Sequence, residues 1–151
     1  MARAPFQVLV CPYRADAGGA FQYALFERPP SAGGYWQPIA GGGEDVETPL
    51  DAARREAAEE GGIDPSERFF ALSSMSMLPV VEVAGFRWGP DVLMIPNYAF
   101  AVSVERSRLR VSIEHVRYAW FSYQDAVGRV RWDDNRHALW ELNHRLTGGV
   151  A

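Results

Sequence analysis

The sequence predicts an α/β layered domain, because strand-like and helix-like segments alternate along its 151 residues. The composition agrees, since 48% hydrophobic, 23% charged and 13% aromatic residues are the balance of one globular domain over residues 1–151. A domain of this length is expected to bury roughly 70% of the surface that its unfolded chain exposes. The same balance argues against disorder, collagen-like repeats and a coiled coil.

Strands are expected where short apolar runs are bounded by turn residues. The predicted strands are residues 6–10, 21–27, 36–39, 68–77, 97–104 and 118–121. A turn at residues 16–19 makes the first two strands a hairpin. Ala40 and the glycines 41–43 are expected to form a glycine-rich loop, and the Pro- and Gly-bearing stretch 78–90 an excursion between two strands.

The most clearly delimited helix is predicted over residues 49–60. Thr48 is a good N-cap, Pro49 suits the first helical position, and Asp51 completes a capping box with Thr48. The glycines 61 and 62 end the run.

Two more helices are predicted near the C-terminal end, a short one after Ser122 and a longer one over residues 133–146. The longer helix carries its apolar residues on one side. These residues are Ala138, Leu139, Leu142 and Leu146.

Several function classes are excluded by what the sequence lacks. Cys11 is its only cysteine, which excludes a disulfide framework and a cysteine zinc cluster and predicts a reducing, cytoplasmic location. All fifteen basic residues are arginines, so a Walker-type phosphate loop and a lysine Schiff base are excluded. The net charge of −4 argues against a nucleic-acid partner. The apolar run 6–11 is too short for a signal peptide core or a membrane span.

The acidic residues are concentrated in one segment. Residues 44–60 hold seven acids and two arginines, a local charge of −5, so the rest of the chain sums to +1. On the predicted helix, Glu56, Glu59 and Glu60 fall within one arc of ~100°, with no cation in that arc. Each like-charge pair at i,i+3 or i,i+4 costs about 0.2–0.5 kcal/mol. Either this is a solvated face, or the oxygens converge on a divalent cation such as Mg²⁺ that also binds substrate phosphates.

The full spacing around these acids forms a recognisable motif. It runs Gly41, five residues, Glu47, seven residues, and then the block Arg55, Glu56, Ala57, Ala58, Glu59, Glu60, Gly61, Gly62, Ile63. This resembles the Nudix box, the 23-residue signature of hydrolases that cleave a nucleoside diphosphate linked to another moiety. Every fixed position matches, and Ala57 is merely smaller than the aliphatic residue that the family more often has.

The resemblance implies a Nudix-type α/β/α sandwich around a mixed β-sheet that binds a divalent metal ion, Mg²⁺ or alternatively Mn²⁺. Carried onto this sequence, it implies Glu56 and Glu60 as the principal metal ligands, with an additional oxygen from the Ala40 carbonyl. Glu59 would be a further ligand or the proton acceptor for a metal-bound water. The resemblance also implies that Glu47 and Arg55 pair and position the helix.

Outside this motif, the chain resembles dihydroneopterin triphosphate pyrophosphatases, also named dATP pyrophosphohydrolases. The residues that carry this likeness are Trp36, Gln37, Glu114, His115, Tyr118, Trp120, Asp125, Ala126, Trp132, Asn135 and Ala138. It implies Glu114 as a further metal ligand or base, whereas His115 is interpreted as structural. The substrate would be a small nucleotide or pterin triphosphate, cleaved to the monophosphate and pyrophosphate.

Substrate contacts are expected from arginines, whose planar guanidinium suits phosphate, and from aromatic rings, whose faces suit flat heterocycles. The candidates for the triphosphate are Arg14, Arg28 and Arg87, and those for the ring are Trp36, Phe86 and Trp88. The stretch 79–90 is placed to cover the pocket.

Two alternatives remain open at this point. Pro79 stands sixteen residues after Ile63, where ADP-ribose hydrolases tend to carry a proline, which keeps ADP-ribose as a substrate. A non-catalytic nucleotide sensor would be expected to lose one of the three helix glutamates, and all three are present. No motif supports a diadenosine polyphosphate substrate.

Overall fold

Strands and helices alternate as predicted in the computed structural model, which describes residues 2–148. In chain order the elements are β1 (Arg3–Ala15), β2 (Phe21–Glu27), the 3₁₀ helix η1 (Pro30–Ala32), β3 (Trp36–Gln37), β4 (Ile39–Glu44), α1 (Pro49–Gly61), β5 (Arg68–Pro79), the 3₁₀ helix η2 (Val80–Glu82), β6 (Met94–Ser103), β7 (Arg117–Phe121), α2 (Tyr123–Arg129) and α3 (Asp133–Gly148). In the described part of the chain, every helix is too short or too polar to span a bilayer.

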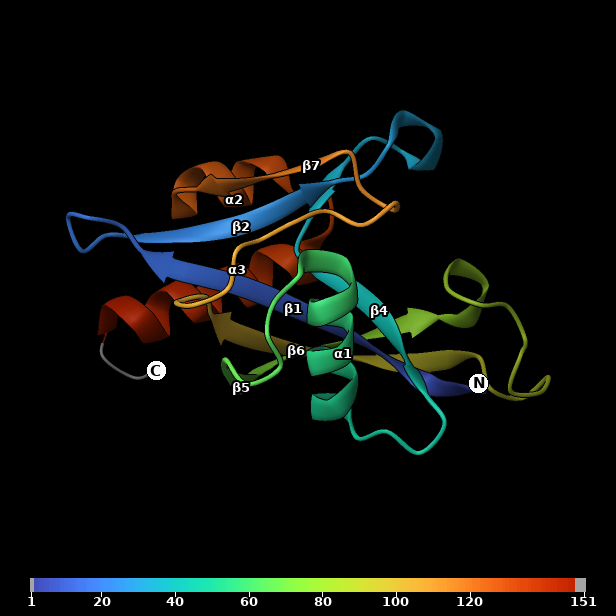
Figure 1. Ribbon diagram of the computed structural model, residues 1–151. Coiled ribbons are helices and arrows are strands. Elements are labelled where there is room, and N and C mark those ends of the chain that lie inside the picture. Colours follow the sequence, from blue (N-terminus) through green and yellow to red (C-terminus); the bar gives the residue numbers. More distant parts are fainter. Residues whose placement is uncertain (1, 149–151) are drawn as a thin grey trace.

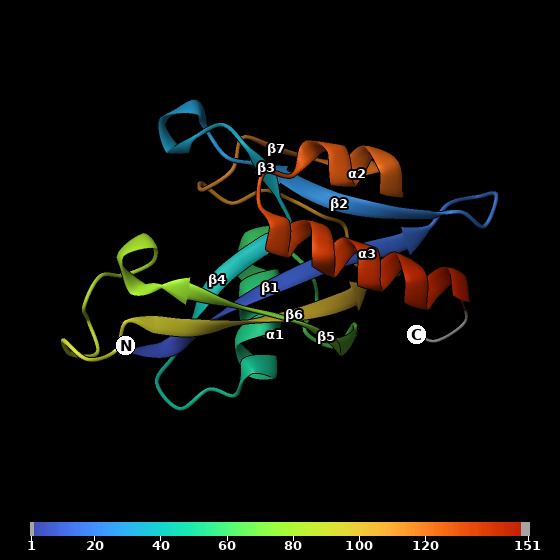
Figure 2. The same cartoon turned by 180° about the vertical axis from the view of Figure 1, so that it is seen from behind.

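The helices cover both faces of one sheet, so the molecule has three layers. Figure 1 shows α1 in front of β1 and β4. Figure 2, seen from behind, shows α3 crossing β1 on the opposite face. α2 packs against α3 and β2. This is the α/β/α sandwich that the sequence motif implied.

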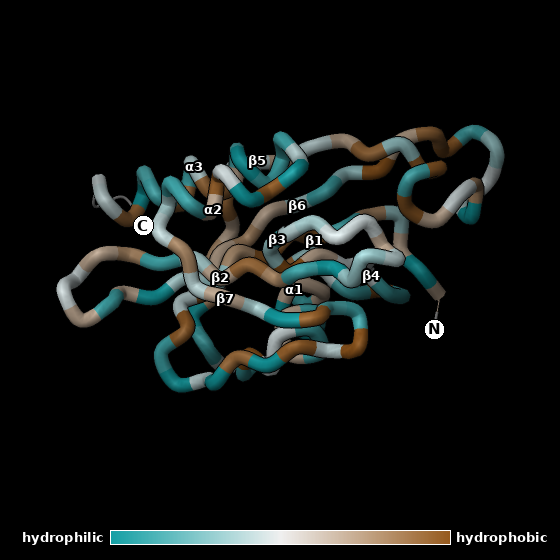
Figure 3. The backbone as a smooth tube through the Cα atoms, turned by 90° about the horizontal axis from the view of Figure 1, so that it is seen from above, coloured by the Kyte–Doolittle hydropathy of each residue, from teal (hydrophilic) through white to brown (hydrophobic). Residues whose placement is uncertain are grey.

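The sheet is mixed and has seven strands. Its main path runs β3-β2-β1-β6-β5, while β4 pairs with β1 and β7 pairs with β2. β1 is parallel to β6, and the other named pairs are antiparallel. β6 lies inside the sheet and is drawn mostly in the colour of apolar residues in Figure 3.

β1 changes its antiparallel partner halfway along its length. Residues up to Val10 pair with β4, whereas residues 13–15 pair with β2. Among the described strands, β4 therefore has no second partner. Its free edge lies beside α1, and this is where the acidic face of α1 meets the sheet.

The three glycines 41–43 lie in a strand, so the expected glycine-rich loop is wrong. β4 extends from Ile39 to Glu44 and includes all three. A Cβ atom at Gly41, Gly42 or Gly43 would overlap the side chain of Glu56, Arg3 or Phe6, respectively. The glycines are needed because they let helix and neighbouring strand approach β4 closely, and not because they form a loop.

The hydrophobic core is divided by the sheet into two clusters. On the α1 side, Ala53 and Ala57 are fully buried in one cluster with residues of β1 and β4. On the α3 side, Ala138, Leu139 and Leu142 are fully buried, as predicted for that helix. Both helices are thus held by their apolar faces, and the polar face of α1 is left for other contacts.

Candidate active site

α1 is firmly fixed at both ends. The Thr48 hydroxyl accepts a hydrogen bond from the Asp51 amide, and the Asp51 carboxylate accepts one from the Thr48 amide, which completes the predicted capping box. Gly62 ends the helix in the left-handed conformation, with φ 69°. The position of the last two turns of α1, which carry the glutamates, is therefore fixed relative to β4.

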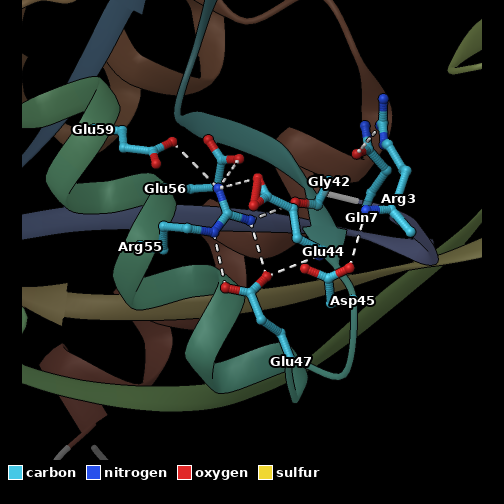
Figure 4. A network of polar contacts seen from close by, with 10 residues as sticks. Arg3, Gln7, Gly42, Glu44, Asp45, Glu47, Arg55, Glu56 and Glu59 are labelled. Atoms are coloured by element: carbon cyan, nitrogen blue, oxygen red, sulfur yellow. Dashed lines mark hydrogen bonds and ion pairs between the residues drawn. The ribbon is translucent and has the colours of Figure 1, made fainter.

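Arg55 is the centre of a polar network between α1 and β4 (Figure 4). It donates two hydrogen bonds to Glu47, at 2.8 and 3.0 Å, and one to the Gly42 carbonyl at 2.8 Å. The same guanidinium lies 2.9 Å from Glu56 and 3.2 Å from Glu59. Sequence reasoning expected no cation within the arc of glutamates, and this is wrong because Arg55 curls back along the helix into it.

Arg55 pairs with Glu47 as the motif implied, through two hydrogen bonds. The hydrogen bond from Arg55 is the main reason that the pKa of Glu47 lies below its ordinary value. Glu47 also accepts the Glu44 amide at 2.8 Å, which ties the β4–α1 loop to the helix. In return, the pKa of Arg55 is raised, so its charge is permanent.

Glu60 faces a second group of residues, from the loop that leads into β7. Its Oε2 lies 3.3 Å from Nδ1 of His115 and 3.5 Å from the Ser112 hydroxyl. The Glu114 carboxyl is close enough to Glu60 to affect its pKa. Burial, followed by this carboxyl neighbour, raises the pKa of Glu60. The structure thus brings Glu114 to the helix glutamates, across more than fifty residues of sequence.

His115 is buried and neutral at this position. Burial lowers the pKa of its imidazole to about 4, and its ring packs 5.5 Å from that of Phe26. Since a neutral imidazole adds no charge, His115 does not neutralise Glu60.

The three helix glutamates do not converge on one point as their side chains stand. Glu56 and Glu59 turn toward Arg55, while Glu60 turns toward His115. Accordingly, within residues 2–148 no three acidic, histidine or cysteine side chains form a ready-made metal cage. A metal ion would have to draw these carboxylates away from their present partners.

The donor set nevertheless fits a hard divalent cation. Glu56 and Glu60 are more than nine-tenths buried, and burial raises the pKa of both. One carboxylate oxygen of Glu44 is buried without a hydrogen-bond partner in the described chain. Because Gly41 has no side chain, the Glu56 carboxylate can pack directly against β4. Buried carboxylates with raised pKa values and too few donors are what a bound cation would relieve.

Two of the three predicted phosphate arginines lie near these carboxylates. Arg28 is close enough for its charge to act on Glu60, Glu114 and His115. Arg87 is close enough to Arg3 for its charge to act on it. Burial and then the charge of Arg87 lower the pKa of Arg3, whereas the charge of Glu56 raises it. Arg3 covers Gly42 next to the Arg55 network, so it joins this group although sequence reasoning did not name it.

Arg14 and Trp36 do not belong to this site, and both predictions are corrected. Arg14 stands seven residues beyond Gln7 on β1, roughly 23 Å away, and stacks over Trp120 at 4.2 Å in a separate cavity of about 990 Å³. Trp36 is only 8% exposed, because its ring packs into the core 5.3 Å from that of Phe121.

A cavity of about 580 Å³ opens on the other side of β4. Ala40 lines it, while the next residue, Gly41, abuts Glu56 on the α1 side. The aromatic residues on its wall are Tyr35 and Trp132, neither of which was predicted. Glu82 and Val83 also line it, so the stretch 79–90 does border a pocket. Of the other predicted ring contacts, Phe86 is exposed and Trp88 donates to the Arg3 carbonyl at 2.7 Å.

An acidic helix packs on a mixed sheet, one arginine holds its glutamates in place, and further arginines lie nearby. This arrangement is typical of proteins that act on phosphorylated substrates. The NUDIX domain family matches residues 6–141, and the chain belongs to this family of hydrolases, which act on phosphoanhydride bonds. Nudix hydrolases generally use divalent metal ions.

Several relatives and solved structures are similar to this chain. Dihydroneopterin triphosphate diphosphatase of Haemophilus influenzae is 29% identical over 108 residues, 70% of this chain and 68% of the relative. A Nudix hydrolase structure from Listeria monocytogenes has a TM-score of 0.87 and 33% identity over 97% of both chains. Escherichia coli dihydroneopterin triphosphate pyrophosphohydrolase shares the fold, with a TM-score of 0.73 and 22% identity over 95% of this chain and 99% of that one. The NUDIX domain of Shewanella oneidensis NrtR, solved with ADP-ribose, has a TM-score of 0.69 and 14% identity over 93% of this chain and 87% of that one.

Proposed function

We propose that this chain is a Mg²⁺-dependent pyrophosphohydrolase acting on a triphosphate such as dihydroneopterin triphosphate or dATP. In this reaction a water oxygen bonds to phosphorus while the bridging P–O bond breaks, which releases the monophosphate and pyrophosphate. The observation that carries the proposal is the burial of Glu56 and Glu60 on one turn of α1. A detectable relative named dihydroneopterin triphosphate diphosphatase supports the substrate class.

Glu56 and Glu60 would hold the metal ion, together with Glu59 and the Ala40 carbonyl. When bound, Mg²⁺ offsets the negative charge on the phosphate oxygens and orients them. A cation held there would offset the burial that raises the pKa of Glu56 and Glu60. Mn²⁺ takes similar oxygen ligands and would substitute for it.

Glu114 and Glu59 are the two candidates for the base. Glu114 is exposed and beside Glu60, so its carboxylate can receive a proton from the attacking water. Glu59 is also largely exposed, and Arg55 holds one of its oxygens at 3.2 Å. Either carboxylate must be ionised to act. For Glu114, the contact with Glu60 and then the charge of Arg28 lower its pKa.

Arg55 and Glu47 are positioning residues in this mechanism. Arg55 orients Glu56 and Glu59, and Glu47 fixes Arg55 through its paired hydrogen bonds. Arg28 and Arg87, with Arg3 beside Arg87, would bind the phosphates from the two sides of β4.

The proposal is tested by turnover on a substrate panel. The full chain is assayed with Mg²⁺ on dATP, dihydroneopterin triphosphate, ADP-ribose and diadenosine tetraphosphate, with pyrophosphate and phosphate measured separately. Release of pyrophosphate from the triphosphates, abolished by EDTA, is expected. A Glu56→Gln/Glu60→Gln double variant should be inactive.

The same panel separates the alternatives. Hydrolysis of ADP-ribose with no pyrophosphate from the triphosphates would identify ADP-ribose as the substrate and contradict the proposal. Binding of a nucleotide with no turnover on any substrate would indicate a sensor and contradict the proposal.

A further inference from the structure

The cavity beside β4 lies within reach of the proposed metal-binding carboxylates. Ala40 lines the cavity and its neighbour Gly41 abuts Glu56, so a single strand separates the two. Its volume of about 580 Å³ is in the range of sites for small organic ligands. If the proposed function is correct, a triphosphate chain can reach from the carboxylates to a ring bound here.

One wall of the cavity is aromatic. The rings of Tyr35 and Trp132 meet edge to face with centroids 5.7 Å apart, and Arg131 stacks on both. Even with these two neighbours, Trp132 remains 47% exposed, which leaves much of a large ring uncovered. A flat heterocycle would cover this surface.

The polar wall is organised by Asp134. Each of its two carboxylate oxygens accepts a hydrogen bond of 3.0 Å from an amide NH₂ group, one from that of Asn97 and the other from that of Asn135. Because an ionised carboxylate only accepts hydrogen bonds, both amides must turn their NH₂ groups toward it. The amide oxygens of Asn97 and Asn135 are buried and have no hydrogen-bond partner in the described part of the chain. This wall therefore has two unused acceptors.

Gln7 has the opposite polarity. Its amide oxygen accepts the Arg3 guanidinium at 2.8 Å, which leaves its NH₂ group as the available donor. Gln7 lines the same cavity as Asn97 and Asn135. The cavity is thus lined by residues with two spare acceptors and one spare donor.

We infer that this cavity binds the substrate ring and selects a 2-amino-4-oxo heterocycle, as in a pterin or a guanine, over adenine. Such a ring has two adjacent donors, the ring N–H and the 2-amino group, and one acceptor, the carbonyl oxygen. It matches the two asparagine oxygens and the Gln7 amide. Adenine has an acceptor nitrogen in place of the ring N–H and an amine in place of the carbonyl. This inference rests on the proposed function for the identity of the phosphorylated tail.

The mismatch should be large enough to measure. A buried acceptor that a ligand leaves unpaired lowers affinity by about tenfold or more. Adenine has neither the ring N–H nor the 2-amino group, so it leaves both asparagine oxygens unpaired and sets its own amine against the Gln7 NH₂. A discrimination of roughly a hundredfold is therefore expected between guanine and adenine.

Binding of the monophosphates dGMP, dIMP and dAMP to the full chain, measured by calorimetry with Mg²⁺ present, tests the inference without any turnover. The hypoxanthine of dIMP keeps the ring N–H and the carbonyl but lacks the 2-amino group. We expect dGMP to bind about tenfold more tightly than dIMP and dAMP to bind weakest. Equal affinities for dGMP and dAMP, or binding of none of the three, would overturn the inference.

Three variants assign the contacts. Asn97→Ala and Asn135→Ala should each weaken dGMP at least tenfold, and one of them should abolish the difference between dGMP and dIMP. Gln7→Glu keeps the shape and the contact with Arg3, so it guards against loss of folding in the alanine variants. It should weaken dGMP and dIMP alike, because a carboxylate cannot donate to their carbonyl oxygen, and strengthen dAMP, whose amine it can accept. Unchanged ring preference in all three variants would overturn the inference.

Failure of the proposed function has a different signature. A chain that binds dGMP over dAMP and yet releases no pyrophosphate from any triphosphate would keep the ring site and lose the catalytic proposal. A chain that hydrolyses dATP and dGTP equally well would keep the catalytic proposal and lose the ring site.

Discussion

The two long helices each carry an arginine and a glutamate paired at i,i+4, and the two pairs behave in opposite ways. On α3, Glu141 accepts the Ser73 amide, the Ser74 amide and hydroxyl, and Arg145, all within 2.8 Å. On α1, the single guanidinium of Arg55 lies within 3.3 Å of four carboxylates, those of Glu44, Glu47, Glu56 and Glu59. Glu141 alone accepts four hydrogen bonds, whereas four carboxylates share the one guanidinium of Arg55.

The pKa values follow this difference. Although burial raises it, the hydrogen bonds from Ser74, Ser73 and Arg145 lower the pKa of Glu141 to about 2. Burial raises the pKa of Glu56, and its bond to Arg55 does not fully offset this. A glutamate with all its acceptor sites used holds two elements together, whereas glutamates that lack donors are available to a metal ion.

The sharpest way to break this comparison is to remove a charge from each helix in turn. Glu59→Gln should lower turnover at least a hundredfold with little change in folding, since it removes charge but hardly any volume. Glu141→Gln, the matched change on α3, should leave turnover within about threefold. Pyrophosphate release under Mg²⁺ measures both, and a fully active Glu59→Gln variant would contradict the mechanism.

For stability, we expect the Glu141→Gln variant to be affected more than the Glu59→Gln variant. Glu141→Gln puts an NH₂ group against amide donors and should cost about 2 kcal/mol of unfolding free energy, because hydrogen bonds to a charged group are lost. For a chain of this size that is a fall of about 4–8 °C in Tm. Thermal unfolding by circular dichroism measures it, with Glu59→Gln as the control that should not fall. Equal Tm values would show that Glu141 is not an anchor.

The same anchor should make stability depend on pH in acid. The pKa of Glu141 is about 2 in the folded chain, below the ordinary 4.5 of an unfolded one. Its contribution is therefore complete above pH ~4.5 and is lost as the pH falls toward about 2. Denaturant unfolding between pH 5 and 2 should show a steeper loss of stability in the wild type than in Glu141→Gln. Parallel curves for the two proteins would contradict this assignment.

A smaller effect is expected from the carboxylate outside α1. Glu114→Gln should lower turnover by at least tenfold and leave the Tm nearly unchanged, because Glu114 is exposed and contacts Glu60 without being part of the core. Steady-state kinetics and a thermal scan on the same preparation test this. Wild-type activity would reject the role.

The smallest effect is expected from the arginine that lies in another cavity. Arg14→Ala should change kcat/KM by less than about twofold, since Arg14 stacks on Trp120 at the far end of β1. Arg28→Ala is the matched change near the carboxylates and should raise KM clearly. If Arg14→Ala proved the more damaging of the two, the placement of the triphosphate would be wrong.

Local patterns were enough to predict the helix and its network. The cap at Thr48 and the spacing from Glu47 to Glu60 depend on residues close in sequence, and the structure has both. The strands other than β4 were predicted in the right places for the same reason, apart from shifted ends. The glycines 41–43 were misassigned because their reason lies in Glu56, Arg3 and Phe6, which no local pattern connects to them.

Contacts between distant segments were the harder part. Trp36 and Tyr35 are neighbours, and only the packing of β3 decides that Trp36 enters the core while Tyr35 lines the cavity. Gln7, Asn97 and Asn135 come from three elements and share no sequence signal. Arg3 was missed because nothing near it in the sequence shows that β1 pairs with β4 at Gly42.

Calorimetric titration of Mg²⁺ into the full chain tests the central claim most directly. The claim predicts saturable binding to the wild type and to Glu141→Gln with equal affinity, and at least tenfold weaker binding to Glu56→Gln/Glu60→Gln. Absence of Mg²⁺ and Mn²⁺ uptake by the wild type, or unchanged uptake by the double variant, would contradict it.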